Sequence, residues 1–352
     1  MFDVMSTLKP SLHKGLFVNI LKCLQKCSRS FQTLNSEDKH TQENTKSRHI
    51  YSKIWKFSDV KSTSEYLVGN VFYHKDGVIA LTKPANLGSS KKEDSIYYCL
   101  PYLAQEFGYK YLKLVHVPDR HHSGVTILAS DAKIAQSLEL ALRRSKAIYS
   151  KEPKQTFMAI TVGHPINDED TKKIGVTKRH KDNVKYPLIL SHWGANEVKR
   201  REVNVGCVNH KVIAKSESAA LVLVSTWQLR HHCPRMFLSD IMLSPVLGDN
   251  MFGPRVSSLF EKPVLIKPWH APAVKALPPL LLQTLNVRSG AESLIPLHFH
   301  LHELVLHGYL KDGSDLVLHS EPPDFFLWTQ KRLNLQVPDE TRNCLTGVDT
   351  VS

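Results

Sequence analysis

Six short runs rich in β-branched, aliphatic and aromatic residues constrain the fold of this chain most, because such runs form strands. They cover residues 78–82, 111–115, 125–129, 157–162, 219–225 and 297–306. One helix is predicted after Ser130 or Asp131, either of which can cap it, since apolar residues recur at helical spacing from Ile134 to Leu142. Strands outnumber helices and do not alternate strictly with them. We therefore predict an α+β fold with a mixed, mainly antiparallel central sheet and flanking helices.

The two ends of the chain differ in composition from its middle. Residues 8–36 contain no Asp or Glu, and their lysines are spread among apolar residues, so this stretch can form a basic amphipathic helix. Such a stretch is typical of a mitochondrial transit peptide, which we predict for residues 1–35; a basic RNA-binding tail or a surface helix is the alternative. A polar stretch without apolar periodicity follows, so we expect a linker over residues 36–49, a folded domain over 50–337 and a C-terminal tail over 338–352.

The formal net charge of +13 over 352 residues favours a polyanionic partner, and nucleic acid is the commonest one. A basic targeting segment combined with a solvated basic surface would give the same surplus. The six cysteines are scattered, apart from Cys23 and Cys27, which fits a reducing compartment. No apolar run is long enough to span a bilayer. Two polar segments interrupt the domain: residues 167–173 are predicted as a hairpin or crossover loop, and residues 178–209 as an insertion that carries basic residues.

One strand is predicted to end in a loop that carries a carboxylate. In the segment from Leu114 to Ala129, Asp119 lies between two strand-like runs, and Ser123 and Gly124 begin the second run. A loop at the end of a strand is held by a rigid scaffold and still opens to a cleft, which suits a reactive group. A plain turn-forming aspartate is the commoner explanation of such a residue.

This segment resembles the catalytic motif of RluA-type RNA pseudouridine synthases, which reads His-Arg-Leu-Asp-x-x-Thr-Ser-Gly. His116, Asp119, Ser123 and Gly124 match that motif. Further family segments follow in the family's order, and the residues that match them are Lys83, Pro84, Ala159, Gly163, Arg230, His232, Arg235, Gly248 and Asp249. A late Leu-His-x-His strand and a closing Pro-x-x-Phe complete the series. The resemblance covers roughly residues 71–335, and its closing segments look most like the mitochondrial members of the family.

The resemblance implies the pseudouridine synthase fold with a catalytic cleft, so residues 50–337 would be the catalytic domain. It implies that Asp119 acts on the nucleotide as nucleophile or base, after the target uridine has flipped out of the RNA. Arg235 would pair bidentately with the Asp119 carboxylate, and Phe157 would stack on the flipped uracil. The four residues implied in substrate binding are His116, Lys83, His232 and Arg120.

The implied reaction is the isomerisation of uridine to pseudouridine, and it needs no cofactor. The implied partner is mitochondrial rRNA, mRNA or tRNA in the mitochondrial matrix, with association with mitochondrial RNA granules or ribosome-assembly factors.

Several departures from the family pattern support a second hypothesis. Phe157 replaces a tyrosine, Val117 replaces an arginine, and Leu229 and His231 replace residues of the Gly-Arg-Thr-His turn. Pro234 would be costly inside a helix, so the helix there should begin at Cys233 or Pro234. The alternative to an active enzyme is therefore a catalytically weakened or inactive RNA-binding or ribosome-assembly factor on the same fold.

Histidines suggest a third reading, a zinc-binding protein. His298, His300 and His302 alternate along one predicted strand and so share a face, and His231, His232 and Cys233 are adjacent. No closely spaced cysteine pair supports zinc, and the late strand is accounted for by the resemblance, so no metal is predicted.

Overall fold

The computed structural model describes residues 49–337, except residues 55, 57–58, 91–93, 146–154 and 261. The predicted transit peptide, all of the linker but His49, and the C-terminal tail lie outside the described residues. His49 itself is packed against the domain, since its Nε2 lies 2.8 Å from the carbonyl oxygen of Leu285. No helix within the described part of the chain is long and apolar enough to cross a membrane.

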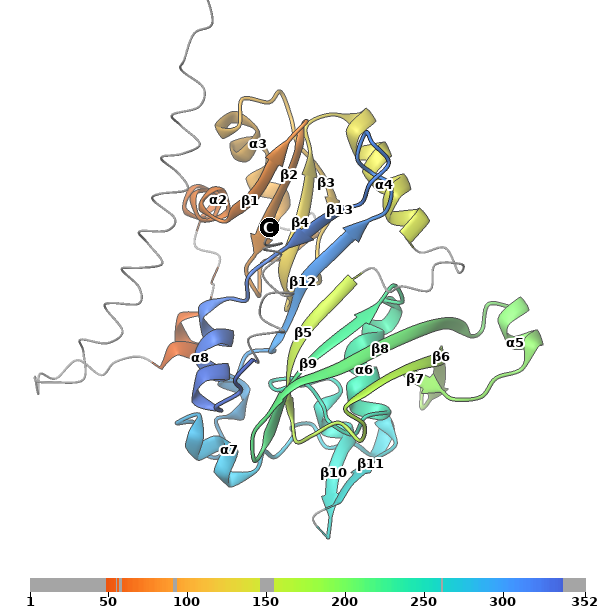
Figure 1. The fold of residues 1–352 in the computed structure, drawn as a ribbon. Helices are drawn as coiled ribbons and strands as arrows, with labels where there is room; N and C mark the ends of the chain where they lie inside the picture. Colours follow the sequence, from red (N-terminus) through yellow and green to blue (C-terminus); the bar gives the residue numbers. More distant parts are fainter. Residues whose placement is uncertain are drawn as a thin grey trace, which may run out of the picture. The chain divides into compact units, whose positions relative to one another are not determined.

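Eleven strands form one sheet (Figure 1). They are β1 Val71–Lys75, β2 Val78–Lys83, β3 Lys113–His116, β4 Ser123–Ala129, β5 Gln155–Val162, β6 Glu169–Lys181, β7 Val184–Leu190, β8 Asn204–Lys215, β9 Ala219–Thr226, β12 Phe299–Leu306 and β13 Leu316–His319. The main order is β1-β2-β4-β12-β5-β9-β8-β6-β7, with β3 paired to β4 and β13 paired to β12. Strands β4 and β12 run parallel and the other pairs are antiparallel. The predicted α+β fold with a mixed, mainly antiparallel sheet is confirmed.

Helices and a separate hairpin surround this sheet. The α-helices are α2 Val60–Gly69, α3 Ile96–Glu106, α4 Ala132–Ser145, α5 Ala195–Lys199, α6 Cys233–Asp240, α7 Pro279–Thr284 and α8 Asp324–Arg332. The 3-10 turns are η1 Ile50–Lys53, η2 Arg230–His232, η3 Gly253–Arg255, η4 Pro268–His270 and η5 Glu292–Leu294. The hairpin joins β10 Val256–Leu259 to β11 Lys262–Leu265.

The centre of the sheet is covered on both faces. All seven residues of β4 are buried. Val125 and Ile127 pack in one apolar cluster with Leu138 of α4, whereas Leu128 packs in another with Leu103 of α3. Because neighbouring side chains of a strand point to opposite faces, β4 contributes to two cores at once. Such a strand is held rigidly, and the loop that precedes it inherits a fixed position.

The predicted strands and helix are present, with ends shifted by a few residues. The helix is α4, and Asp131 caps it: the backbone N–H of Ile134 donates to Asp131 Oδ1 at 2.8 Å.

The polar segments differ from the prediction. Residues 169–181 are the long strand β6, and residues 178–209 contain the end of β6, then β7, α5 and the start of β8. Most of the outer residues of β6 and the first two of β7 are exposed, so the apolar alternation that marks a strand is missing there. Their strand conformation comes from pairing with neighbouring strands, which sequence periodicity does not record.

Candidate active site

A pocket opens at the centre of the sheet, next to the loop between β3 and β4. Its polar lining includes His116, Asp119, His122 and His232, and Phe157 forms part of its apolar wall. These residues come from the β3–β4 loop, from β5 and from the η2 turn before α6. The expectation that Asp119 and Phe157 line one cleft is therefore met.

Lys83, the last residue of β2, holds the β3–β4 loop in place. The Lys83 side chain is fully buried, and its Nζ donates to the carbonyl oxygens of Pro84, Leu87, Arg120 and His122 at 2.7–3.2 Å. Burial lowers its pKa to about 7, while the charge of Asp119 acts in the opposite direction. Lys83 does not line the pocket, and its side chain faces four carbonyls, so a structural role fits these contacts better than the expected contact with substrate. Its structural part is to hold the two residues that flank His121 in place.

A glycine fixes the start of β4 beside the same loop. Gly124 has φ +126°, and a Cβ on it would come within 2.2 Å of the carbonyl oxygen of Leu301 on β12. Only glycine permits the two parallel strands to approach this closely. The Ser-Gly pair of the motif thus sets the spacing of β4 and β12 directly behind Asp119.

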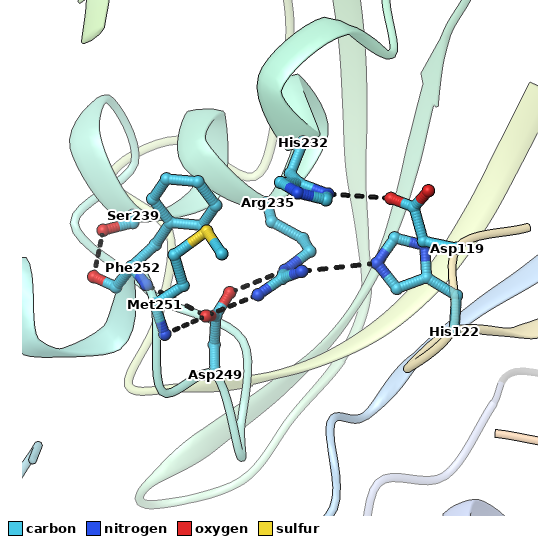
Figure 2. A network of polar contacts seen from close by, with 8 residues as sticks. All are labelled: Asp119, His122, His232, Arg235, Ser239, Asp249, Met251 and Phe252. Carbon is cyan, nitrogen blue, oxygen red and sulfur yellow. Dashed lines mark hydrogen bonds and ion pairs between the residues drawn. The ribbon is translucent and has the colours of Figure 1, made fainter. Parts of the chain in front are cut away.

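His232 is the direct partner of Asp119. Its Nδ1 lies 2.8 Å from Asp119 Oδ2 (Figure 2). The hydrogen bond from His232 lowers the pKa of Asp119 to about 2, against the effect of burial; nearby charges, including Arg235, lower it further. Asp119 is therefore ionised near neutral pH, and its side chain is 57% exposed, so the carboxylate is open to an incoming group.

An unusual backbone turn places His232 there. His231 and His232 both have left-handed conformations, with φ values of 58° and 57°, and α6 begins at the next residue, Cys233. Non-glycine residues adopt this conformation at a cost, which is roughly 1–2 kcal/mol per residue. Pro234 lies in the first turn of α6, where its missing N–H costs nothing, so the predicted start of this helix is confirmed.

Arg235 lies close to Asp119 but pairs with another carboxylate. Its Nε and Nη2 donate to Asp249 Oδ2 and Oδ1 at 2.9 and 2.7 Å, and both side chains are buried (Figure 2). The predicted bidentate pair between Arg235 and Asp119 is therefore not what the structure shows. The Asp249 carboxylate is oriented toward Arg235 by the backbone, because its Oδ1 also accepts hydrogen bonds from the backbone N–H groups of Met251 and Phe252, both at 2.9 Å.

The turn before Asp249 explains why that carboxylate is so well placed. Gly248 has φ +79°, and a Cβ there would lie 2.0 Å from the carbonyl oxygen of Pro296. Burial would raise the pKa of Asp249, but Arg235 and the two backbone donors outweigh it and lower the pKa. Sequence reasoning found the Gly-Asp motif but gave Asp249 no place in the site.

His122 is a second residue of the pocket that the sequence motifs did not indicate, because it stands where the family motif has a threonine. It is buried, and its Nε2 lies 3.5 Å from Arg235 Nη1. Burial and the charge of Arg235 hold the pKa of His122 well below its usual range, so the imidazole is neutral at physiological pH. A neutral imidazole that lines the pocket can accept a proton.

Phe157 is more enclosed than a free stacking platform would be. Its side chain is 3% exposed, and its ring stacks on Phe299 with a centroid distance of 4.7 Å and an interplanar angle of 15°. One face of the ring is thus occupied by the protein. Of the remaining predicted residues, His116 lines the pocket, while Arg120 is half-exposed at its rim and forms an ion pair with Asp94.

The histidines of β12 are used by protein groups. His298 contacts the Pro296 carbonyl and Thr329 Oγ1, and His300 contacts Ser123 Oγ and the Ser320 carbonyl, all at 2.8–2.9 Å. Within the described ranges, the group whose ligand atoms lie close enough to hold a metal ion is Asp119, His122 and His232, within 4.8 Å of one another. The zinc reading points to the histidines of the late strand instead.

Comparisons with known proteins agree with this geometry. No family model matches the chain. The mitochondrial mRNA pseudouridine synthase RPUSD3 of Homo sapiens is 26% identical over 273 residues, which is 75% of this chain and 75% of that protein. The mitochondrial pseudouridylate synthase RPUSD4 of Homo sapiens is 25% identical over 292 residues, 79% of this chain and 72% of that protein.

Solved structures show the same fold. The human RNA pseudouridylate synthase domain containing 4 matches with a TM-score of 0.62 and 22% identity, covering 80% of this chain and 98% of that one. The human RNA pseudouridylate synthase domain containing 1 matches with a TM-score of 0.51 and 13% identity, over 79% and 95% of the two chains. Together with the motifs that converge on one pocket, these relationships show that the chain is similar to mitochondrial RNA pseudouridine synthases and shares the fold of the two solved structures.

Proposed function

We propose that this chain is an RNA pseudouridine synthase that acts on mitochondrial RNA in the matrix, with Asp119 as the group that attacks or deprotonates the nucleotide. The observation that carries the proposal is the ionised, half-exposed Asp119 at a pocket built from three motifs that lie far apart in sequence. Relatives named as mitochondrial pseudouridine synthases support it.

The reaction breaks the bond from N1 of uracil to C1′ of ribose and forms a bond from C5 to the same carbon. N1 gains a proton and C5 loses one, so no redox partner is needed. Asp119 supplies the negative charge for the first step. The family's tyrosine hydroxyl is absent at Phe157, so another group accepts the C5 proton. His232 lines the pocket with its Nδ1 toward Asp119, and its other ring nitrogen can accept this proton.

His232 and Arg235 support the reactive carboxylate in different ways. His232 fixes one oxygen of Asp119, so the side chain is oriented before substrate arrives. Arg235, neutralised by Asp249, lies behind His122 and favours its neutral form. Under this proposal, His116 and His232 contact the nucleotide at the pocket, and Arg120 contacts the flanking RNA from the rim.

The test of the proposal is pseudouridine mapping of mitochondrial RNA from cells with and without this chain, rescued with wild type or with Asp119→Asn. Wild type should restore pseudouridine at specific sites, and Asp119→Asn should restore none, because it keeps the shape and removes the charge. RNA binding by Asp119→Asn should be equal to wild type or slightly tighter, since one negative charge is lost. Circular dichroism provides the folding control.

A companion variant, Phe157→Tyr, asks whether the missing hydroxyl limits the rate. A faster reaction would show that it does, and an unchanged rate would leave the proton transfer with the histidines.

The competing reading is a non-catalytic RNA-binding or ribosome-assembly factor, associated with mitochondrial RNA granules. It is favoured by the enclosed ring of Phe157 and by the replaced Val117. Rescue of mitochondrial function by Asp119→Asn, with no pseudouridine lost in cells without the chain, would decide for it. A reporter fused to residues 1–35 tests the location, and a fusion that stays in the cytosol would contradict the predicted transit peptide.

A further inference from the structure

The outer part of β6 and β7, together with α5, forms a basic arm, defined here as residues 177–201. It contains seven Lys or Arg residues and two acidic residues, Asp182 and Glu197. The seven cationic side chains are all exposed: Lys178, Arg179, Lys181, Lys185, Lys199, Arg200 and Arg201. Figure 1 shows this arm running outward beyond the other strands, toward α5 at the right of the view.

Within the described residues, no cationic side chain of the basic arm forms an ion pair with a carboxylate. Every ion pair between Lys or Arg and a carboxylate in the described part of the chain involves residues outside the seven. Elsewhere on the same sheet, Lys172, Lys211 and Lys215 each have an acidic neighbour. A surplus that is exposed and unneutralised favours a polyanion from outside.

The base of the arm packs against α6, the helix that follows the η2 turn of the pocket. Lys178 lies on the same face of β6 as Ile174 and Val176, since alternate residues share a face, and these two pack in the core that includes Phe237 of α6. Burial and then the charge of Lys178 lower the pKa of His231, which places this ammonium within electrostatic reach of the η2 turn. The next residue, His232, contacts Asp119.

Aromatic rings accompany the charges. Arg179 is the ladder partner of Tyr186, whose ring lies 6.0 Å from that of Trp269. Lys267 Nζ lies 5.8 Å from the centroid of the Trp269 ring. Basic side chains and aromatic rings are the groups that bind single-stranded nucleic acid, because the charges follow the backbone and the rings stack on bases. Here the rings lie beside Arg179, on the face of β6 opposite to that of Lys178.

We propose that the basic arm binds the phosphate backbone of the RNA strand that flanks the uridine in the pocket. The inference rests on the proposed function only for the identity of the nucleotide. The charge and the exposure of the arm are properties of the chain itself. RNA is favoured over an acidic protein because the arm belongs to the same sheet as the proposed nucleotide pocket.

The test compares two triple variants that lose the same charge. The arm variant is Lys178→Ala, Arg179→Ala and Lys185→Ala. The control is Lys75→Ala, Lys110→Ala and Lys133→Ala, three exposed lysines outside the arm, of which Lys75 lies on β1 at the opposite edge of the sheet. Binding of fluorescent polyuridine and of mitochondrial RNA is measured over a series of salt concentrations.

The arm variant should bind at least tenfold more weakly at low salt. Its plot of log affinity against log salt should be flatter by about 2, since each phosphate contact on a single strand contributes about 0.7. The control should stay near wild type. Equal losses in both variants would overturn the inference, as would competition by polyglutamate as strong as that by RNA, which would indicate a protein occupant.

The outcome is separable from the proposed function. If wild type forms no pseudouridine but the arm variant still loses RNA affinity selectively, the arm inference stands and the enzyme proposal fails. If wild type forms pseudouridine and both variants bind alike, the enzyme proposal stands and the arm inference fails.

Discussion

Asp119 and Lys83 have different roles at this site: one carries the reactive carboxylate and the other holds the loop that bears it. Asp119 is exposed and contacts an imidazole, so its carboxylate is ionised and oriented but not enclosed. Lys83 is enclosed and touches four carbonyls, two of them in the loop that carries Asp119. The reactive group is therefore free to meet substrate because a buried neighbour holds the backbone beneath it.

Lys83→Met should test this division. The change removes the donor for four buried carbonyls, so we expect a loss of about 3 kcal/mol of stability. The released loop should also misplace Asp119, with a rate loss on the order of 100-fold, as expected for a displacement of about 1 Å. Urea unfolding and pseudouridine formation measure the two effects. Lys331→Met, at an exposed position of α8, is the control and should change neither; a Lys83→Met protein as stable as wild type would refute the role of Lys83.

At the scale of elements, the turn η2 and helix α6 form the part of the site that departs most from the family pattern. The chain passes through two left-handed residues, His231 and His232, and Pro234 then begins α6. This turn aims His232 at Asp119, and the first turn of α6 aims Arg235 at Asp249. The turn therefore folds although Leu229 and His231 replace residues of the family motif. The group that contacts the Asp119 carboxylate is the imidazole of His232 and not the guanidinium of Arg235.

Substitutions at His231 should reveal its backbone strain. His231→Gly should be neutral or stabilising by about 0.5 kcal/mol, because relief of the left-handed strain exceeds the entropy cost of glycine. His231→Val should destabilise by roughly 1–2 kcal/mol, since a β-branched residue tolerates this conformation poorly. The same pair at His180, an exposed position within β6, should show the opposite order, because valine suits a strand better than glycine. Urea unfolding gives the values, and an identical order at both positions would contradict the strain.

At the scale of the whole molecule, the sheet brings together residues that are far apart in the chain and buries several histidines in doing so. Burial lowers the pKa values of His298 and His300 to about 3, although hydrogen bonds to backbone groups oppose it. Both imidazoles are therefore neutral in the folded protein throughout the range in which the unfolded chain titrates, near pH 6.5. The fold as a whole thus depends on pH through groups outside the pocket.

The free energy of unfolding should fall as the pH drops from 7 to 5. Below pH 6.5 the unfolded chain binds protons at these histidines and the folded chain does not, so acid favours unfolding. Each residue should contribute a loss of about 1.4 kcal/mol per pH unit, or about 2 kcal/mol at pH 5. The pair should therefore contribute about 4 kcal/mol. Asp119 would add to this loss, but not between pH 7 and 5, because the stabilisation from its lowered pKa declines only below about pH 4.

Urea unfolding at a series of pH values measures the effect. His300→Gln removes one of the buried imidazoles, so its profile below pH 6.5 should be flatter than that of wild type by about 1.4 kcal/mol per pH unit. A wild-type profile without slope between pH 7 and 5 would contradict the neutral, buried state of these rings.

The sequence by itself determined the elements and segments that depend on local pattern. Runs rich in β-branched, aliphatic and aromatic residues located β2, β3, β4, β5, β9 and β12, helical spacing located α4, and the proline rule located the start of α6. The order of the motifs identified Asp119 as the candidate reactive residue. These features are readable because periodicity, caps and turn residues act over a few positions along the chain.

Only the tertiary structure decided which groups meet. The sequence does not show whether the Arg235 guanidinium pairs with Asp119 or with Asp249. It pairs with Asp249, whose buried carboxylate is also held by two backbone N–H groups. The sequence also does not show that the Lys83 side chain is buried. The four carbonyls that surround it come from two separate turns, which lie side by side only in the folded protein. Nor does the sequence reveal β6 and β7 beyond the core, where hydrogen bonds between strands, and not burial of side chains, define the structure.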